Sequence, residues 1–315
     1  MSFIPELHAP LIIIAGPTAS GKSDLAQDVA EAVDGEVISA DSMQVYRRMD
    51  IGTGKLPREE RRVPHWGIDL VDPGEPYSVA LYQDYARRKA AEIDARGKRV
   101  ILCGGTGFYI RGVIDDYEYP AGEQRGNAIR EKYLALLSEI GPDALWSLLN
   151  DRDAASAALI APNDTKRVIR AFELLNEGTS YAAQRERLKH IPQVVPAVYI
   201  ALARDTAELN ARIERRVDAM REAGLVDEVR GLIADGFREA ITAPQAIGYK
   251  EIVAALDGEC EMDEAFELIK RATRRYAKRQ RTWFRGDSRV KWVETDEPAH
   301  TLERVLDVCR GENAL

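Results

Sequence analysis

The sequence has few of the residues that build disulfides and metal centres. Its 315 residues include three cysteines, with no C-x-x-C spacing, and four scattered histidines. These numbers exclude a disulfide framework and a zinc site. Long hydrophobic runs are also lacking: the longest near the N-terminus, residues 11–15, is far shorter than the about 20 residues of a membrane span. No basic flank or cleavage site of a signal peptide accompanies it. We therefore expect a protein of the cytoplasm, with no membrane association, whose thiols are reduced and mostly buried.

A net positive charge is absent as well. The chain carries −8 at neutral pH, which at first argues against a nucleic-acid partner. The charge is segregated, however, because residues 270–291 hold ten Lys or Arg against one acid, a local charge of +9 that leaves −17 for the remainder. We therefore expect a basic face on an acidic protein.

Strands and helices alternate in the first third of the chain. Apolar periodicity predicts strands at residues 11–15, 36–40 and 99–103, and helices at 23–33 and 78–96. This alternation is typical of an α/β fold with a parallel sheet flanked by helices. Strand character returns at 194–203 and again at 290–294, with a helix predicted at 206–223.

The middle of the chain has a different pattern. Helical periodicity at 127–150, 154–160 and 164–176 continues without an intervening strand, which indicates an α-helical insertion. We therefore expect three segments. The core would begin at 1–115, a helical insertion domain would follow at 116–194, and the core would resume at 195–315 and include a basic C-terminal helix.

A glycine-rich loop joins the first predicted strand to the first helix, the context that a P-loop requires. In such a loop, backbone N–H groups and the positive end of the helix converge on phosphate oxygens. Lys22 would add a point charge, and the Ser23 hydroxyl is placed to ligate Mg²⁺. The alternative, a turn that merely caps the helix, fits the specificity of the motif less well. We expect a ligand with at least a diphosphate, bound by Gly16, Pro17, Thr18, Ala19, Ser20, Gly21, Lys22 and Ser23.

The loop alone does not identify the reaction, since it serves ATPases, kinases and enzymes whose leaving group is pyrophosphate. A Walker-B strand, which ends in Asp, would indicate an NTPase, but the third strand leads instead into a Gly-Gly-Thr-Gly turn at 104–107. That turn is either a tight connection or a place where a nucleotide approaches the backbone. The candidate acid is Asp41, at the carboxyl end of the second strand. Three roles stay open for Asp41, which are general base, metal ligand and N-cap of a following helix.

Seven motifs occur in one order, namely GPTASGKS, DSMQVYRRMDIGT, DLVDPGEPYS, GGTGFY, PNDTKRVIRAFE, QAIGYKE and YAKRQRTWFR. From about residue 11 to residue 293, they resemble the tRNA dimethylallyltransferase family, which prenylates N6 of the adenosine just 3′ of the anticodon. The resemblance implies a P-loop NTPase-like core with an α-helical insertion domain. It also implies three partners, which are Mg²⁺, dimethylallyl diphosphate and the anticodon stem-loop of tRNA. Two departures are visible: Ser23 replaces the commoner threonine, and Trp66 follows His65 where a second histidine is frequent. We assign His65 no catalytic role.

The resemblance also implies a division of labour in catalysis. Asp41 would accept a proton from the adenine amine as it attacks, and Arg216 would contact the diphosphate. Lys22 and the Thr18 hydroxyl would stabilise the charge that develops on the leaving group. For Arg216, a solvated arginine on a charged helix is the alternative, because Arg212 and Arg215 look similar. The expected catalytic residues are Asp41, Thr18, Lys22 and Arg216.

Recognition of tRNA is expected to involve both parts of the chain, because an adenine in an anticodon loop must be extruded to reach a crevice. In the segment 245–250, Gly248 would allow close approach and Tyr249 would be available for stacking. The residues expected to contact tRNA are Asp41, Ser42, Met43, Gln44, Thr106, Arg130, Lys166, Arg167, Val168, Ile169, Arg170, Gln245, Ala246, Ile247, Gly248, Tyr249 and Lys250.

The basic helix between 270 and 284 adds a further candidate surface, because cations recur there at three- and four-residue spacing. It could track phosphates, close over the donor diphosphate, or simply be solvated. Its cations are Lys270, Arg271, Arg274, Arg275, Lys278, Arg279 and Arg281, interleaved with Tyr276, Trp283 and Phe284.

Three other functions remain open. An isopentenyltransferase acting on free adenine nucleotides would share the loop and the acid but would not need the insertion. A P-loop kinase or ATPase would need the Walker-B sequence that is missing, and a non-catalytic RNA-binding module would leave Asp41 without a purpose. We expect a monomer.

Overall fold

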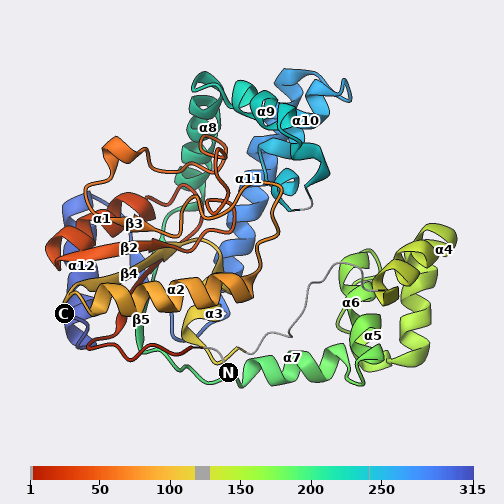
Figure 1. The fold of residues 1–315 in the computed structure, drawn as a ribbon, viewed down its shortest axis with the longest axis horizontal. Helices are drawn as coiled ribbons and strands as arrows, with labels where there is room; N and C mark the ends of the chain where they lie inside the picture. Colours follow the sequence, from red (N-terminus) through yellow and green to blue (C-terminus); the bar gives the residue numbers. More distant parts are fainter. Residues whose placement is uncertain (1–2, 118–127, 241) are drawn as a thin grey trace. The chain divides into compact units, whose positions relative to one another are not determined.

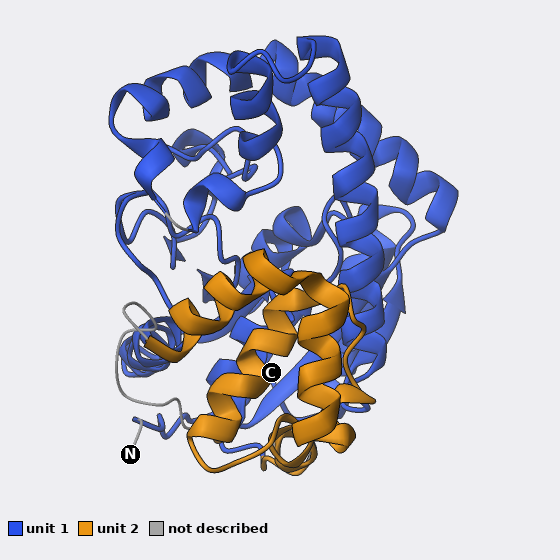
Figure 2. Ribbon diagram, turned by 90° about the vertical axis from the view of Figure 1, so that its right-hand side faces the viewer, with its two compact units in different colours: residues 1–115, 193–315 blue, residues 116–192 orange. Residues whose placement is uncertain are grey.

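The computed structural model describes residues 3–117, 128–240 and 242–315. These residues form two compact units, one made of Met1–Asp115 with Gln193–Leu315 and the other of Asp116–Pro192 (Figure 2). The chain thus leaves the first unit after its first part and returns to it.

A six-stranded parallel sheet forms the centre of the first unit (Figure 1). The strands lie in the order β3-β2-β4-β1-β5-β6, and every pair of neighbours is parallel. The α/β fold with a parallel sheet is therefore confirmed. The strands are β1 (Leu11–Ala15), β2 (Gly35–Ser39), β3 (His65–Trp66), β4 (Arg99–Gly104), β5 (Ala197–Ala203) and β6 (Lys291–Glu294).

The central strand β1 is buried on both faces, as its uninterrupted apolar sequence predicts. Ile13 faces one hydrophobic cluster together with α2 (Val79–Asp94) and α3 (Gly107–Ile114). Ile14 faces the other cluster together with α1 (Lys22–Ala32) and α12 (Pro298–Gly311). Burial of such an isoleucine contributes about 1.5–3 kcal/mol, so helices on both faces stabilise the strand that leads into the glycine-rich loop.

Four further helices of the first unit extend the first cluster beyond the sheet. They are α8 (Thr206–Glu222), α9 (Leu225–Ala234), α10 (Tyr249–Leu256) and α11 (Met262–Arg285). α11 begins two turns before its basic segment, because Ala265, Phe266 and Ile269 bury an apolar stripe there. Short 3₁₀ turns lie at Arg58–Glu60, Phe237–Glu239 and Ala243–Gln245.

The second unit is helical. It contains α4 (Ala128–Arg152), α5 (Ala154–Ala157), α6 (Thr165–Asn176) and α7 (Tyr181–Lys189). α4 is kinked at Gly141, whose φ is +79°, just before Pro142. Tyr133 and Phe172 stack with ring centroids 4.0 Å apart and join α4 to α6. The predicted start of the first helix, residue 127, lies outside the described residues.

Two general expectations concern cysteines and membranes. Cys103 and Cys309 are buried and Cys260 is partly buried, and all three are free thiols. Burial raises the pKa of Cys103 to about 12, so this thiol stays protonated. Among the described residues, we find no helix with the length and apolar character needed to cross a bilayer.

Candidate active site

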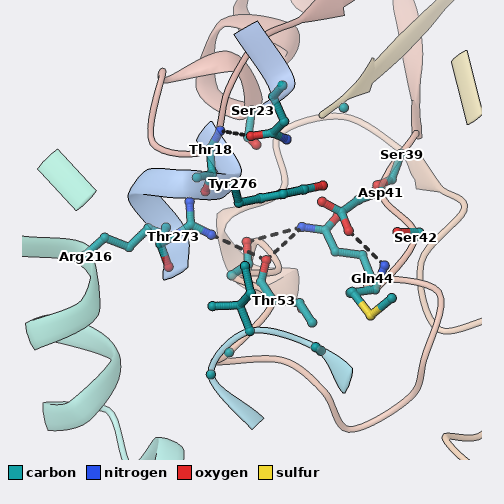
Figure 3. A pocket seen from close by; sticks show the side chains of 18 of the residues that line it. Thr18, Ser23, Ser39, Asp41, Ser42, Gln44, Thr53, Arg216, Thr273 and Tyr276 are labelled. Carbon is teal, nitrogen blue, oxygen red and sulfur yellow. Dashed lines mark hydrogen bonds between the residues drawn. The ribbon is translucent and has the colours of Figure 1, made fainter. Parts of the chain in front are cut away.

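A pocket of about 360 Å³ lies at the carboxyl ends of β1, β2 and β4 (Figure 3). Ligands of open parallel sheets bind at this edge. Its wall includes the glycine-rich loop, the stretch after β2, the 52–56 loop, the end of β4, and parts of α8 and α11. The segment 245–250 closes a further side. The pocket brings together residues far apart in sequence and is the candidate active site.

The loop between β1 and α1 has the shape of a phosphate cradle. Ala19 and Gly21 have positive φ angles of +62° and +91°, which turn successive peptide groups toward one side. α1 begins at Lys22, so the positive end of a helix faces the same space. Arg212 fixes the loop from outside by donating from Nε to the carbonyl of Ala19 at 2.8 Å. The predicted loop–helix arrangement is present.

A second hollow, of about 430 Å³, lies on the outer side of this loop. It shares Lys22, Ser23 and Arg216 with the first pocket. Cations dominate its wall, which includes Lys22, Lys55, Arg212, Arg215 and Arg216 against Asp24 and Glu60. The two hollows therefore meet at a cationic junction suited to a diphosphate.

The charges at this junction are held in a partly desolvated state. Burial lowers the pKa of Lys22, and the neighbouring Arg216 lowers it further, while Cys103 and Asp41 oppose the shift. Lys22 donates from Nζ to the carbonyl of Pro17 at 3.3 Å, a contact that a phosphate oxygen can replace. Burial also lowers the pKa of Arg216, with Asp41 opposing the shift. A bound anion would offset the free energy that it costs to bury both cations.

Arg216 differs clearly from its two sequence neighbours. It lines the pocket and donates from Nη2 to the carbonyl of Thr53 at 3.4 Å (Figure 3). Arg212 supports the loop, and Arg215 lines only the outer hollow. The solvated-arginine alternative for Arg216 is therefore wrong.

Asp41 lies just beyond β2 and lines the same pocket as Lys22. Its Oδ1 accepts the N–H of Met43 at 2.9 Å (Figure 3), which fixes the side chain in an Asx turn. No helix follows at 42–48, so the N-cap role is wrong. A second carboxylate oxygen is left for chemistry, because no other hydrogen bond to Asp41 is found among the described residues.

Polar neighbours complete this part of the wall. Thr106 accepts the N–H of Ser42 at 3.1 Å. Gln44 accepts the Ser39 hydroxyl at 2.8 Å and donates to the carbonyls of Thr53 and Gly54, both at 3.4 Å. Ser42, Met43 and Gln44 all line the pocket.

The glycine turn after β4 is packed against α11. A Cβ atom on Gly105 would lie 2.1 Å from Nε2 of Gln280, and one on Gly107 would lie 2.0 Å from Nε1 of Trp283. These glycines are therefore required by the close approach of α11. Of the two interpretations of this turn, the structure supports a tight connection.

The segment 245–250 supplies Gln245, Ala246, Ile247, Gly248 and Lys250 to the pocket wall. Tyr249 differs from these residues, because its ring is 0% exposed. Its hydroxyl donates to Glu228 at 2.6 Å. The expected stacking role of Tyr249 is wrong: helical geometry at the start of α10 turns this side chain into the core.

The tRNA candidates of the second unit have mixed surroundings. Val168 and Ile169 are buried in the helical core, so their side chains are not available to a partner. Lys166 is exposed. The three arginines are paired with carboxylates: Arg130 with Glu173 at 2.7 Å, Arg167 with Asp164 at 2.7 Å, and Arg170 with Glu173 at 3.1 Å.

The basic segment of α11 divides into two faces. Lys270 and Arg274 pair with Asp218 and Glu214 of α8, and Arg281 donates to the hydroxyl of Thr206. A neighbouring face of the helix exposes a cationic stripe, which consists of Arg271, Arg275, Lys278 and Arg285.

Of the aromatic residues interleaved with these cations, only one is well exposed. Phe284 is 0% exposed and Trp283 is 43% exposed. Tyr276 lines the pocket. The segment therefore both packs α11 against α8 and presents cations to solvent.

Several pocket residues were missed from the sequence. Thr53, Gly54, Thr273 and Gln280 carry no signal of their own, since each reaches the pocket wall only through the tertiary fold. His65 also lines the pocket, and its Nδ1 contacts the carbonyl of Val63 at 2.9 Å. Burial lowers its pKa, so the ring is neutral at pH 7.

The residues present suit a Mg²⁺ ion bound beside a diphosphate. Ser23 is exposed and opens onto both hollows. In the described part of the chain, no cluster of three or more His, Cys, Asp or Glu could hold a metal by itself. Magnesium takes few protein oxygens and completes its shell with substrate phosphates and water, so a single hydroxyl beside a diphosphate fits it.

Comparison with known proteins gives a consistent result. The family model "IPP transferase" matches residues 44–287, and the model "Isopentenyl transferase" matches residues 9–63. The tRNA dimethylallyltransferase of Carboxydothermus hydrogenoformans is 47% identical over 94% of this chain and 95% of its own length. That of Rhodococcus jostii is 44% identical over 95% and 96%.

Solved structures agree with these relatives. The tRNA isopentenylpyrophosphate transferase from Bacillus halodurans is 40% identical, with a TM-score of 0.70 and 97% coverage of both chains. A eukaryotic dimethylallyltransferase acting on tRNA is 28% identical, with a TM-score of 0.75, and covers 98% of this chain and 80% of its own.

Proposed function

The chain belongs to the IPP transferase family, and from this premise we propose that it transfers a dimethylallyl group from dimethylallyl diphosphate to N6 of the adenosine 3′ of the anticodon in tRNA. Its reaction class, prenylation of tRNA, is that of its close relatives. The observation that carries the residue-level proposal is the shared pocket of Asp41, Lys22 and Arg216, because one carboxylate and two cations there face a single space.

The donor diphosphate binds at the cationic junction. Lys22, Arg216 and the N–H groups of the 16–23 loop surround the space where it would lie. When the allylic C1–O bond breaks, both electrons of that bond pass to the diphosphate oxygen. The two cations, the N–H groups and the Thr18 hydroxyl then stabilise the added negative charge. The loop thus holds a leaving group and takes no part in phosphoryl transfer.

The acceptor adenine enters from the Asp41 side of the pocket. Its N6 forms the new bond to C1 as the C1–O bond breaks, and the proton lost from N6 passes to the free oxygen of Asp41. The Met43 N–H holds the other oxygen at 2.9 Å, so the carboxylate is oriented before the substrate arrives. General-base assistance of this kind contributes about 10²–10⁴ to a rate.

We propose that a Mg²⁺ ion is held by the Ser23 hydroxyl beside the donor diphosphate. When bound, Mg²⁺ would neutralise part of the charge of the diphosphate.

The acceptor is tRNA, and two surfaces are proposed to hold it. The first is the cationic stripe of α11, with Trp283 available as an aromatic surface for an unpaired base. The second is the helical unit 116–192, where the exposed Lys166 and the half-exposed ends of Arg130 and Arg167 would meet phosphates. Each of these arginines would exchange a carboxylate partner for a phosphate. Because a surface ion pair contributes little free energy, losing the carboxylate costs little.

We propose that the active form is a monomer. We place its work in the cytoplasm, where its substrate tRNA is found. Sedimentation velocity at micromolar concentration tests the oligomeric state.

The decisive experiment incubates the protein with unmodified tRNA, dimethylallyl diphosphate and Mg²⁺, followed by mass spectrometry of the nucleosides. The expected product is N6-dimethylallyladenosine at the position 3′ of the anticodon. Parallel reactions contain AMP in place of tRNA, or ATP in place of the donor. Prenylated AMP with unmodified tRNA, or rapid ATP hydrolysis alone, would overturn the proposal.

A further inference from the structure

Glu228, in the first turn of α9, binds the backbone of residues 50–52. Its Oε2 accepts the N–H groups of Asp50 and Ile51 at 3.0 and 2.8 Å. Its Oε1 accepts the N–H of Gly52 at 3.2 Å and the hydroxyl of Tyr249 at 2.6 Å. An ionised carboxylate has about four lone-pair sites, so these four donors saturate it.

The loop concerned, residues 50–54, has little freedom to move. A Cβ atom on Gly52 would lie 2.4 Å from the ring of Tyr249, and one on Gly54, whose φ is +60°, would lie 1.8 Å from Nη2 of Arg216. The two glycines therefore allow the backbone to fit between a buried tyrosine on one side and Arg216 on the other.

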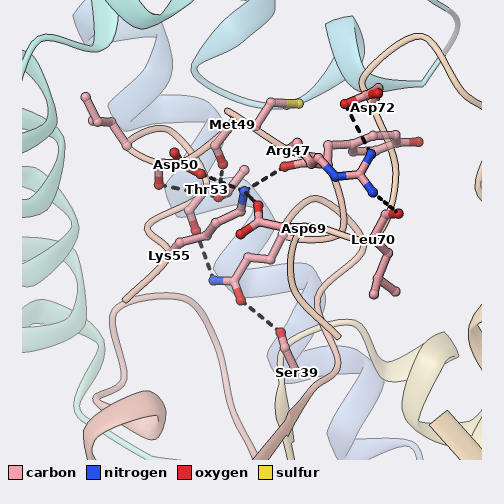
Figure 4. Close-up of polar contacts among 12 residues, drawn as sticks. Ser39, Arg47, Met49, Asp50, Thr53, Lys55, Asp69, Leu70 and Asp72 are labelled. Atoms are coloured by element: carbon pink, nitrogen blue, oxygen red, sulfur yellow. Dashed lines mark hydrogen bonds and ion pairs between the residues drawn. The ribbon is translucent and has the colours of Figure 1, made fainter. Parts of the chain in front are cut away.

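The far end of the loop is anchored by Lys55, whose side chain is 3% exposed. Its Nζ donates to the carbonyl of Tyr46 at 2.6 Å, to Asp50 at 2.7 Å and to Asp69 at 2.6 Å (Figure 4). With Glu228 at one end and Lys55 at the other, the carbonyls in between have a fixed position.

Those carbonyls are the contact between the loop and the pocket. The carbonyl of Thr53 accepts Nη2 of Arg216 and Nε2 of Gln44, each at 3.4 Å (Figure 3). Glu228 itself does not line the pocket. It can affect the site through this loop, and through Tyr249, which lies between the pocket-lining residues Gly248 and Lys250.

We propose that Glu228 is a positioning residue of the prenyl-transfer site, which sets the Arg216 guanidinium for the donor diphosphate by fixing the 50–54 backbone. The proposal rests on the proposed function, since it assigns the diphosphate of the donor as the group that Arg216 meets. It also gives a structural role to residues 50–54, Asp-Ile-Gly-Thr-Gly. Their backbone connects Glu228 of α9 to Arg216 of α8.

The test is a double-mutant cycle with inorganic pyrophosphate and Mg²⁺ as the probe, measured by calorimetry. Glu228→Gln replaces one acceptor oxygen by an NH₂ group, so the four donors cannot all be paired. We expect pyrophosphate to bind about tenfold more weakly, as for the loss of one charge-assisted hydrogen bond. In the Arg216→Gln background, the same change should have no further effect, because the arginine that it positions is gone.

The matched control is Asp227→Asn, which removes a carboxylate from the same helix turn, where it pairs with the exposed Arg230. It should bind pyrophosphate as the parent protein does. Glu228→Asp, which keeps the charge, should recover part of the loss. Circular dichroism and the melting temperature report whether each variant folds.

An equal loss from Glu228→Gln with and without Arg216 would overturn the proposal, as would full pyrophosphate affinity in folded Glu228→Gln. Pyrophosphate binding does not require prenyl transfer, so these outcomes are independent of whether the proposed function holds. If prenyl transfer is measured as well, the variant should raise KM for the donor and leave the dissociation constant of tRNA unchanged.

Discussion

Gln280 of α11 and Thr18 of the P-loop are joined by a hydrogen bond of 2.9 Å across 262 residues of sequence, with the Thr18 N–H as donor and Oε1 of Gln280 as acceptor. The same amide donates from Nε2 to the carbonyl of Gly105 at 2.9 Å. Gln280 is 5% exposed. One buried amide therefore connects α11 to the 16–23 loop and to the 104–107 turn, and it engages an N–H group that a P-loop would otherwise offer to phosphate.

Replacement of this amide by an apolar side chain should weaken both the fold and donor binding. Gln280→Leu leaves the Thr18 N–H and the Gly105 carbonyl without partners, at a cost of about 1–3 kcal/mol for each buried group. Urea denaturation should show a lower midpoint, and KM for the donor should rise. Thr282→Ala on the exposed side of the same helix is the control. A variant with an unchanged midpoint and KM would show that the amide is dispensable.

Asp41→Asn should remove the chemical step and little else. The amide oxygen can still accept the Met43 N–H, but the side chain can no longer take a proton from N6. We expect the single-turnover rate to fall about 10²–10⁴-fold, with the dissociation constant of tRNA unchanged. Asp72→Asn, which removes a surface partner of Arg47, should retain the parental rate. An unchanged rate in Asp41→Asn would exclude it as the base.

Much of this site could be predicted from local sequence, because its phosphate-binding part is local. The 16–23 loop is one contiguous segment between a buried strand and a helix, so its conformation follows from its own glycines and neighbours. Asp41 could be placed for a similar reason, since it directly follows the second strand. Arg216 needed the resemblance, because nothing in its helix distinguishes it from Arg215.

The predictions that failed concern side chains whose exposure depends on which face of a helix packs against the rest of the protein. Trp283 and Phe284 are adjacent, yet about 100° of helix rotation between them leaves one 43% exposed and the other buried. Tyr249 is buried for the same reason. The helix α7 was not predicted because its nine residues, Tyr181–Lys189, contain few apolar side chains. The strand β3 was not predicted because two residues are too few to show a periodic pattern.

Lys22 should lower the free energy of unfolding, although its charge is proposed to bind the diphosphate. Burial lowers its pKa below the ordinary value of 10.5, so between the two values the unfolded chain binds more protons than the folded one. The free energy of unfolding contributed by this group therefore rises with pH across that window, and the penalty of the buried charge is greatest below the folded pKa. Lys22→Met should raise the free energy of unfolding at pH 7 and abolish pyrophosphate binding.

Denaturation of both proteins at pH 7 and pH 9.5 checks this prediction. The advantage of Lys22→Met should shrink at the higher pH, because the penalty of the buried charge falls as pH rises toward the ordinary pKa. An advantage that is constant or grows with pH would contradict the assigned cause.

The cationic stripe of α11 should contribute to tRNA affinity and to its salt dependence. Arg275 and Lys278 are exposed, and no carboxylate pairs with either in the part of the chain described. Each phosphate contact that is lost lowers the slope of log K against log salt by about 0.9 for duplex and about 0.7 for single strands. The double variant Arg275→Ala/Lys278→Ala should therefore bind an anticodon stem-loop more weakly, with a slope shallower by up to about 2. The turnover number at saturating tRNA should be unchanged, because neither residue lines the pocket.

The control is Arg230→Ala/Lys291→Ala, which removes the same charge from positions paired with Asp227 and Glu312. If both double variants change the affinity and the slope equally, net charge alone controls binding and the stripe is not a contact surface.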